Sequence, residues 1–131
     1  MEDTTSREDR LANLLVVEDD PRIAAVLVKG LQKQGFQVDC VATGTAAIER
    51  AAGFDVLLLD LGLPDIDGLE VLRELRHRCV RVPVVVITAR TDPRDRAVAA
   101  ELGVRSYLTK PFAWSAVWAA VRDCLSARDR A

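Results

Sequence analysis

Five side chains that can take part in chemistry directly follow four short segments of strand length, three of which are fully apolar. They are Glu18 and Asp19 after residues 14–17, Asp60 after 56–59, Thr88 after 84–87 and Lys110 at the end of 105–109. An unbroken apolar run of this length is typical of a strand covered on both faces, as in a parallel sheet. A carboxylate at the end of such a strand costs roughly several kcal/mol unless it is paired or metal-bound. Since open α/β sheets bind ligands at the carboxyl ends of their strands, we expect these side chains to form one site.

Carboxylate oxygens and one amine define the chemistry of this predicted site. Three carboxylates this close cannot all stay ionised without a cation. Oxygen ligands without histidine or cysteine favour a hard ion, so the pattern indicates Mg²⁺, with Mn²⁺ or Ca²⁺ as substitutes. Asp60 would then be a nucleophile able to form an aspartyl phosphate. The Lys110 ammonium and the Thr88 hydroxyl would stabilise the phosphoryl oxygens during an in-line transfer.

Most of these residues also have an ordinary structural interpretation when each is taken alone. Asp20 is best explained as a helix cap, Thr88 fits a strand end, and Lys110 fits a solvated surface. Asp65 and Asp67 are more typical of turns than of metal sites. Only the joint pattern favours a functional site.

Strands and helices are expected to alternate around this site. Predicted strands cover residues 14–17, 36–41, 56–59, 84–87 and 105–109, and predicted helices begin after Asp20, after Thr43, near Gly68, after Asp92 and near Trp114. This alternation indicates right-handed βαβ units, and therefore an α/β fold of the (βα)5 type, with a parallel sheet between two helical layers. The apolar runs suit the middle of the sheet, and the alternating run 36–41 suits an edge.

The composition is that of one globular domain. The chain has 131 residues, 50% of them hydrophobic, and a net charge of −2, which gives no support for a nucleic-acid groove or a membrane segment. Three widely spaced cysteines without a CxxC pair indicate reduced thiols and a cytoplasmic protein. We expect a flexible arm over residues 1–12, the domain over 13–127 and a short tail over 128–131.

Four motifs at these positions resemble those of one protein family. They are Leu-Val-Val-Glu-Asp-Asp-Pro, Leu-Leu-Leu-Asp-Leu-Gly-Leu-Pro-Asp-Ile-Asp-Gly, Val-Ile-Thr-Ala and Tyr-Leu-Thr-Lys-Pro-Phe. In this order and spacing they resemble the receiver domain of two-component response regulators, the CheY-like family, over nearly the whole chain. The resemblance implies a flavodoxin-like, doubly wound sheet with strand order 2-1-3-4-5.

The resemblance also assigns roles to the residues of the acidic site. Asp60 matches the phosphoacceptor and Asp19 the carboxylate that binds Mg²⁺ directly. Glu18 matches its neighbour, which often acts through water. Gly62 stands where a backbone carbonyl completes the metal shell.

Three further residues match the switch machinery of that family. Thr88 matches the hydroxyl that moves toward the phosphoryl group, and Tyr107 matches the aromatic residue that follows it. Lys110 matches the family lysine, and its bond to Pro111 matches the usual cis peptide. Phosphorylation would thereby remodel the face formed by the fourth helix, the fifth strand and the fifth helix.

The resemblance implies a phosphorylation-activated signalling switch, with no enzymatic activity beyond phosphorylation and dephosphorylation of its own Asp60. The partners implied are a sensor histidine kinase or phosphotransfer protein and a downstream protein target. We expect no direct nucleic-acid binding by this chain, and a monomer or a weak homodimer that depends on phosphorylation.

One surface departs from the receivers that drive winged-helix DNA-binding proteins. Those receivers tend to carry acidic residues just before the switch tyrosine, whereas this chain has Arg105 and Ser106 there. The last helix has small residues such as Ala116 beside Trp114. These features favour a hydrophobic partner surface at Trp114, Arg105 and Ala116 over charged dimer contacts.

Three alternative functions remain open from the sequence. The chain can be the receiver fragment of a longer DNA-binding transcriptional regulator, although no basic recognition helix follows the last predicted helix. An aspartate-nucleophile phosphatase is disfavoured because that class has a second Asp two residues after the nucleophile, where this chain has Gly62. A phosphate-blind interaction module would not explain the intact set of site residues.

Overall fold

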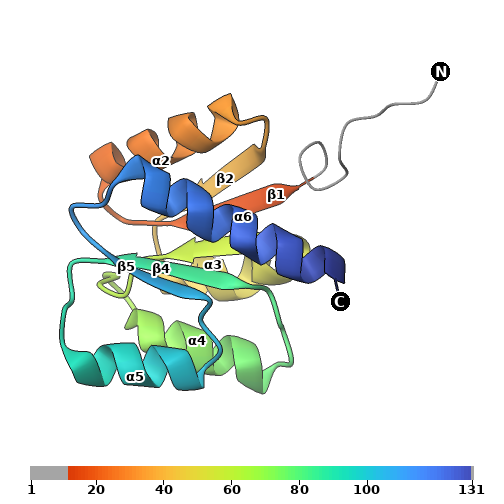
Figure 1. Ribbon diagram of the computed structural model, residues 1–131. Coiled ribbons are helices and arrows are strands. Elements are labelled where there is room, and N and C mark those ends of the chain that lie inside the picture. Colours follow the sequence, from red (N-terminus) through yellow and green to blue (C-terminus); the bar gives the residue numbers. More distant parts are fainter. Residues whose placement is uncertain (1–11, 131) are drawn as a thin grey trace.

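A central parallel sheet organises the molecule. A computed structural model describes residues 12–130, with side chains up to residue 127. Its strands are β1 (Asn13–Val17), β2 (Gln37–Val41), β3 (Val56–Leu59), β4 (Val84–Thr88) and β5 (Ser106–Thr109), in the order β2-β1-β3-β4-β5 (Figure 1). All four strand pairs are parallel. The predicted fold and strand order are confirmed.

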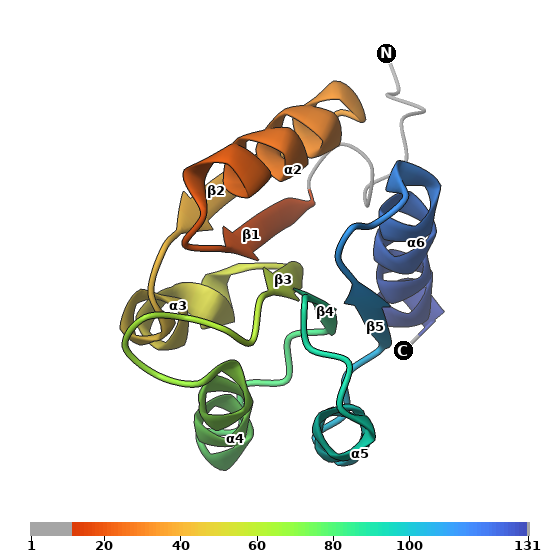
Figure 2. The same cartoon turned by 90° about the vertical axis from the view of Figure 1, so that its left-hand side faces the viewer.

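Helices cover both faces of this sheet. They are α2 (Pro21–Lys33), α3 (Gly44–Arg50), α4 (Gly68–His77), α5 (Pro93–Glu101) and α6 (Trp114–Arg130), with a 3₁₀ turn η1 (Ala51–Gly53) after α3. Helices α2 and α6 lie on one face, and α3, α4 and α5 lie on the other (Figure 2).

Alternating strand residues divide the core into two layers. Leu14 and Val16 of β1 face α2 and α6, whereas Leu15 and Val17 face α3, α4 and α5. Every residue of β3 and β4 is buried. Edge strand β2 has no fully buried residue, which agrees with its polar alternation. The continuous apolar runs therefore lie where both faces of the sheet are covered.

Local signals start the helices where the sequence predicts. Asp20, Thr43 and Asp92 cap α2, α3 and α5 through side-chain oxygens that accept backbone N–H bonds. Proline follows the cap of α2 and of α5 at the first helical position. These caps satisfy N–H groups that have no partner within the helix.

Two structural features lie close to the predicted boundaries of the domain, which remain a prediction. Ala12, assigned to the arm, is fully buried, and its carbonyl accepts a hydrogen bond from the Gln37 N–H at 3.2 Å. Helix α6 continues to Arg130, into the predicted tail. The rest of the predicted arm, residues 1–11, lies outside the described residues. Among the helices described, none has the length and apolarity needed to cross a bilayer.

Cys79 holds a backbone conformation that usually requires glycine. It follows α4 with φ of 62°, and the Val80 N–H bonds back to the Leu75 carbonyl, as in a helix-ending turn. We expect Cys79→Gly to raise the free energy of unfolding by about 1 kcal/mol, because glycine adopts positive φ without a Cβ clash. Urea unfolding measures this change.

The same replacement at Cys40 is the control for that experiment. Cys40 lies in β2 and is exposed, and its φ is not positive. Glycine there is expected to destabilise the protein because it weakens a strand. Equal effects at the two sites would contradict the backbone explanation.

Candidate functional site

The candidate site lies at the edge of the sheet where the strands end. Figure 2 views this edge, with the loops that follow β1, β3 and β4 toward the reader. The fold brings together residues 18, 60 and 110, which are far apart in the sequence, because parallel strands all end on the same side.

Lys110 joins two buried carboxylates. Its Nζ lies 2.8 Å from Glu18 Oε1 and 3.1 Å from Asp60 Oδ2. Asp60 Oδ1 accepts the Gly62 N–H at 3.2 Å, and Glu18 Oε2 accepts the Asp20 N–H at 3.1 Å. The two carboxylates are thus held by one ammonium and by backbone donors, which satisfies much of their need for solvation.

Burial sets the electrostatics of this pair. Glu18 is 3% exposed and Asp60 is 6% exposed. Burial raises the pKa of Glu18, and the hydrogen bond from Lys110 offsets only part of that effect. Burial alone would lower the pKa of Lys110, but its bonds to Glu18 and Asp60 outweigh burial and raise that pKa. Lys110 therefore stays charged at neutral pH.

The acidic residues fit a small, hard cation. Glu18, Asp19 and Asp60 each offer one carboxylate oxygen, and these oxygens lie within 4.8 Å of one another. Asp19 is exposed beside the two buried acids, so the group is open to solvent on one side. An all-oxygen donor set of this size is the kind that Mg²⁺ prefers.

Thr88 and Tyr107 are connected to the same edge through one loop. The Thr88 side chain is buried at the end of β4, and its Oγ1 accepts the Arg90 N–H at 3.3 Å. The Tyr107 hydroxyl donates to the Arg90 carbonyl at 3.1 Å. Burial raises the pKa of Tyr107, so its hydroxyl is a hydrogen-bond donor at neutral pH.

The chain matches the response regulator receiver domain over residues 14–122. It belongs to this family. Receiver domains are signalling switches rather than classical enzymes.

Several curated relatives of the chain are named as transcriptional regulatory proteins. The chain is 41% identical over 111 residues to the transcriptional regulatory protein TcrA of Mycobacterium tuberculosis, and this match covers 83% of the chain and 44% of TcrA. It is 44% identical over 101 residues to the transcriptional regulatory protein KdpE of the same species, covering 76% of the chain and 44% of KdpE. The chain spans about half the length of the curated relatives it matches.

Solved receiver structures have the same fold. One is the receiver domain of a Pseudomonas aeruginosa sensor histidine kinase with a magnesium ion in its active-site cleft. It is 31% identical, with a TM-score of 0.79, and the match covers 88% of this chain and 98% of that one. The BeF3-activated receiver domain of Klebsiella pneumoniae RstA is 29% identical with a TM-score of 0.80, covering 86% and 97%.

The residues of the predicted partner surface have contacts within the receiver. The Trp114 ring lies over Gly30 of α2 and is only partly exposed. Arg105 pairs with Asp123 of α6 at 2.9 Å, and Ala116 is partly buried. A partner surface at these residues remains a prediction.

The absence of a side chain at Gly30 allows the Trp114 ring to pack against α2. A Cβ at position 30 would lie 2.5 to 3.0 Å from three atoms of the Trp114 ring. We expect Gly30→Ala to destabilise the receiver, although this change usually stabilises a helix by about 1 kcal/mol. In a Trp114→Leu background the same change is expected to stabilise, and a double-mutant cycle in urea measures the difference.

Sequence reasoning missed the role of two aspartates in the loop after β3. Asp65 is predicted to be a turn former, but its carboxylate accepts N–H bonds from Gly44 and Thr45 at 2.8 and 3.0 Å and so adds to the Thr43 cap at the start of α3. The hydrogen bond from the Thr45 hydroxyl, together with these two N–H bonds, holds the pKa of Asp65 well below its usual range. Asp67 caps α4 and also pairs with Arg90. The Asp67-Gly68 pair was a signal for the cap, but nothing local pointed to Arg90.

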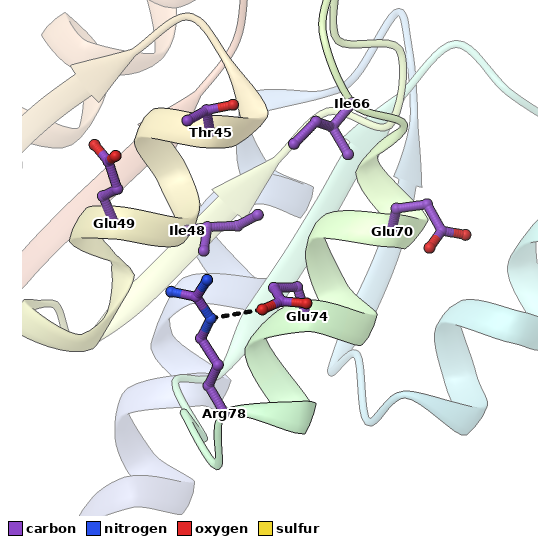
Figure 3. A pocket seen from close by; sticks show the side chains of 7 residues that line it. All are labelled: Thr45, Ile48, Glu49, Ile66, Glu70, Glu74 and Arg78. Carbon is purple, nitrogen blue, oxygen red and sulfur yellow. Dashed lines mark hydrogen bonds and ion pairs between the residues drawn. The ribbon is translucent and has the colours of Figure 1, made fainter.

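A separate groove of about 470 Å³ lies between α3 and α4, away from the acidic site. Figure 3 shows Ile48 and Ile66 between the two helices, with Glu49 and Glu70 pointing outward and the Arg78–Glu74 ion pair between the helices. Nothing in the structure shows what would cover this groove.

Proposed function

We propose that this receiver domain accepts one phosphoryl group on Asp60 in a Mg²⁺-dependent reaction. The donor would be the phosphohistidine of a sensor kinase or phosphotransfer protein. The observation that carries this proposal is the placement of Lys110 Nζ within 3.1 Å of both Glu18 and Asp60. A buried carboxylate held by a lysine, with an open acidic cluster beside it, suits nucleophilic attack on phosphorus.

The proposed transfer makes one bond and breaks one. An Asp60 oxygen attacks the phosphorus, the P–N bond to the donor histidine breaks, and the imidazole leaves with its electron pair. Lys110 remains beside Asp60 and offsets the charge on the phosphoryl oxygens, while the Gly62 N–H holds Asp60 Oδ1. The Thr88 hydroxyl is the further donor assigned from the sequence.

Glu18, Asp19 and Asp60 are the side chains that would hold Mg²⁺, with the Gly62 carbonyl as a fourth donor. When bound, the ion supplies positive charge that neutralises the acids and the incoming phosphoryl oxygens. The output surface would be the face of α5, β5 and α6, because Tyr107 lies on β5 and bonds to the loop before α5.

Asp60→Asn tests the acceptor directly. Wild type incubated with acetyl phosphate and Mg²⁺ is expected to gain the mass of one phosphoryl group, and the variant is expected to gain none, because an amide cannot form the acyl phosphate. Intact-protein mass spectrometry measures both. Asp123→Asn, on the exposed side of α6, is the matched control and should be phosphorylated like wild type. A phosphoryl group on the Asp60→Asn protein, or gain without Mg²⁺, would refute the proposal.

The second candidate is that this receiver belongs to a longer DNA-binding regulator. It is favoured by the relatives named as transcriptional regulators and by the fraction of their length that the chain spans. The acceptor chemistry would be the same in both cases, and the length of the native gene distinguishes them. A phosphatase assay on small phosphoesters tests the disfavoured enzymatic alternative.

A further inference from the structure

Arg90 connects three segments around the acceptor site. It lies in the loop between β4 and α5, and its side chain is 32% exposed. Its backbone N–H, its backbone carbonyl and its guanidinium each make a contact with a different part of the fold. No motif assigned from the sequence uses this guanidinium.

On one side the guanidinium binds the loop that follows Asp60. Nη2 donates to the Leu61 carbonyl at 3.2 Å and to Asp67 Oδ2 at 2.5 Å. Leu61 is the residue directly after Asp60, and Asp67 caps α4. A movement of this loop would therefore act directly on the Arg90 side chain, because charge-assisted bonds of this length are strong and directional.

On the other side Arg90 reaches the output surface. Nη1 lies 3.8 Å from Asp95 Oδ2 in the first turn of α5. The Arg90 carbonyl accepts the hydrogen bond of Tyr107, and Arg96 of α5 stacks over the Tyr107 ring at 4.4 Å. The position of the Arg90 backbone therefore fixes where the Tyr107 hydroxyl can bond.

We propose that Arg90 is a positioning residue that couples the loop after Asp60 to Tyr107 through its guanidinium. The tether to Leu61, Asp67 and Asp95 holds the loop between β4 and α5 in place, and with it the carbonyl that binds Tyr107. This connection is separate from the Thr88 hydroxyl, whose hydrogen bond within the described residues is the one that it accepts from the Arg90 N–H. The coupling between a phosphoryl group at Asp60 and Tyr107 rests on the proposed function of Asp60. The tether, meaning the contacts of the Arg90 guanidinium with Leu61, Asp67 and Asp95, does not.

The single tyrosine of the chain makes the tether measurable without any ligand. A fluorotyrosine label gives a ¹⁹F resonance from position 107 alone. Arg90→Gln and Asp95→Asn are expected to shift or broaden this resonance and to speed amide exchange of residues 89–91 by about tenfold, because a lost anchor lets the loop open locally. Arg90→Lys should give a smaller effect, since an ammonium keeps the positive charge but lacks the planar set of N–H donors of the guanidinium.

Arg94→Gln is the matched control for these variants. Arg94 lies at the start of α5, and within the described part of the chain its side chain pairs with Asp92, two residues before it. It should leave the Tyr107 resonance and the loop exchange unchanged. Unchanged spectra in Arg90→Gln and Asp95→Asn, or equal changes in Arg94→Gln, would overturn the tether.

Beryllofluoride with Mg²⁺ tests the coupling itself. In wild type and Arg94→Gln, binding at Asp60 is expected to move the Tyr107 resonance. In Arg90→Gln the ligand should still bind, but the movement should fall to less than half of the wild-type value. A full response in Arg90→Gln would overturn the coupling. If wild type does not bind beryllofluoride, the proposed function of Asp60 fails, and the ligand-free spectra alone decide on the tether.

Discussion

Lys110→Met is expected to slow phosphorylation strongly and to destabilise the receiver at neutral pH. The variant leaves Glu18 and Asp60 buried without their shared cation, which costs up to about 3 kcal/mol for a pair that retains some solvent contact. Loss of the charge beside Asp60 is expected to slow phosphoryl gain at least about 100-fold. Urea unfolding and intact-protein mass spectrometry measure the two effects.

The pH dependence of the destabilisation in Lys110→Met follows from the pKa shifts of Glu18 and Lys110. Burial raises the pKa of Glu18, so the folded state binds that proton more tightly than the unfolded state, and stability falls as pH rises through the pKa of the folded protein. Lys110 opposes this shift of the Glu18 pKa. The destabilisation caused by Lys110→Met should therefore be large at pH 7, where Glu18 is charged, and small near pH 4, where Glu18 is protonated. In wild type the raised pKa of Lys110 stabilises the folded protein. This stabilisation is complete at pH values below 10.5, the ordinary pKa of lysine, and is lost as pH rises through the higher pKa of Lys110 in the folded protein.

Two comparisons make the Lys110 result specific. Lys29→Met removes a lysine from the exposed face of α2 and should change neither stability nor phosphorylation measurably. Mg²⁺ should restore part of the stability of Lys110→Met, because a cation can replace the lost charge. A loss of stability that is equal at pH 4 and pH 7 would contradict the electrostatic explanation.

Gly68→Ala is expected to be the most damaging single methyl addition near the site. The Gly68 N–H bonds to the Leu61 carbonyl at 2.8 Å, and this contact brings the start of α4 close to the end of β3. A Cβ at position 68 would lie 2.5 Å from Leu61 Cα and 2.8 Å from the Asp60 carbonyl oxygen. Because these are backbone atoms, relief requires the loop after Asp60 to move, at a cost of about 1–3 kcal/mol.

The same substitution should also reduce phosphorylation, since the displaced loop carries the Gly62 N–H that holds Asp60 Oδ1. Urea unfolding and phosphoryl gain from acetyl phosphate measure both losses. Gly53→Ala is the control, because a Cβ there meets nothing within 4 Å. If Gly68→Ala and Gly53→Ala behaved alike, the close approach at Asp60 would not be what requires glycine.

Local patterns in the sequence were sufficient to predict most strands and helix starts, and to predict which charged side chains meet at the edge of the sheet. The apolar runs of β1, β3 and β4 predicted buried parallel strands because both faces of each are covered. The caps Asp20, Thr43 and Asp92 predicted helix starts because they satisfy nearby N–H groups. Since all parallel strands end at one edge, these elements also predicted that Glu18, Asp60 and Lys110 would meet, as they do.

Only the tertiary structure decided the contacts between segments that are distant in the sequence. Asp65 caps a helix 20 residues before it, Arg90 links Leu61 with Tyr107, and the Trp114 ring rests on Gly30. Each of these contacts depends on how two separate βα units approach and on which rotamer a long side chain adopts. The sequence around each residue carries no record of its distant partner, so local periodicity and propensity could not reveal them.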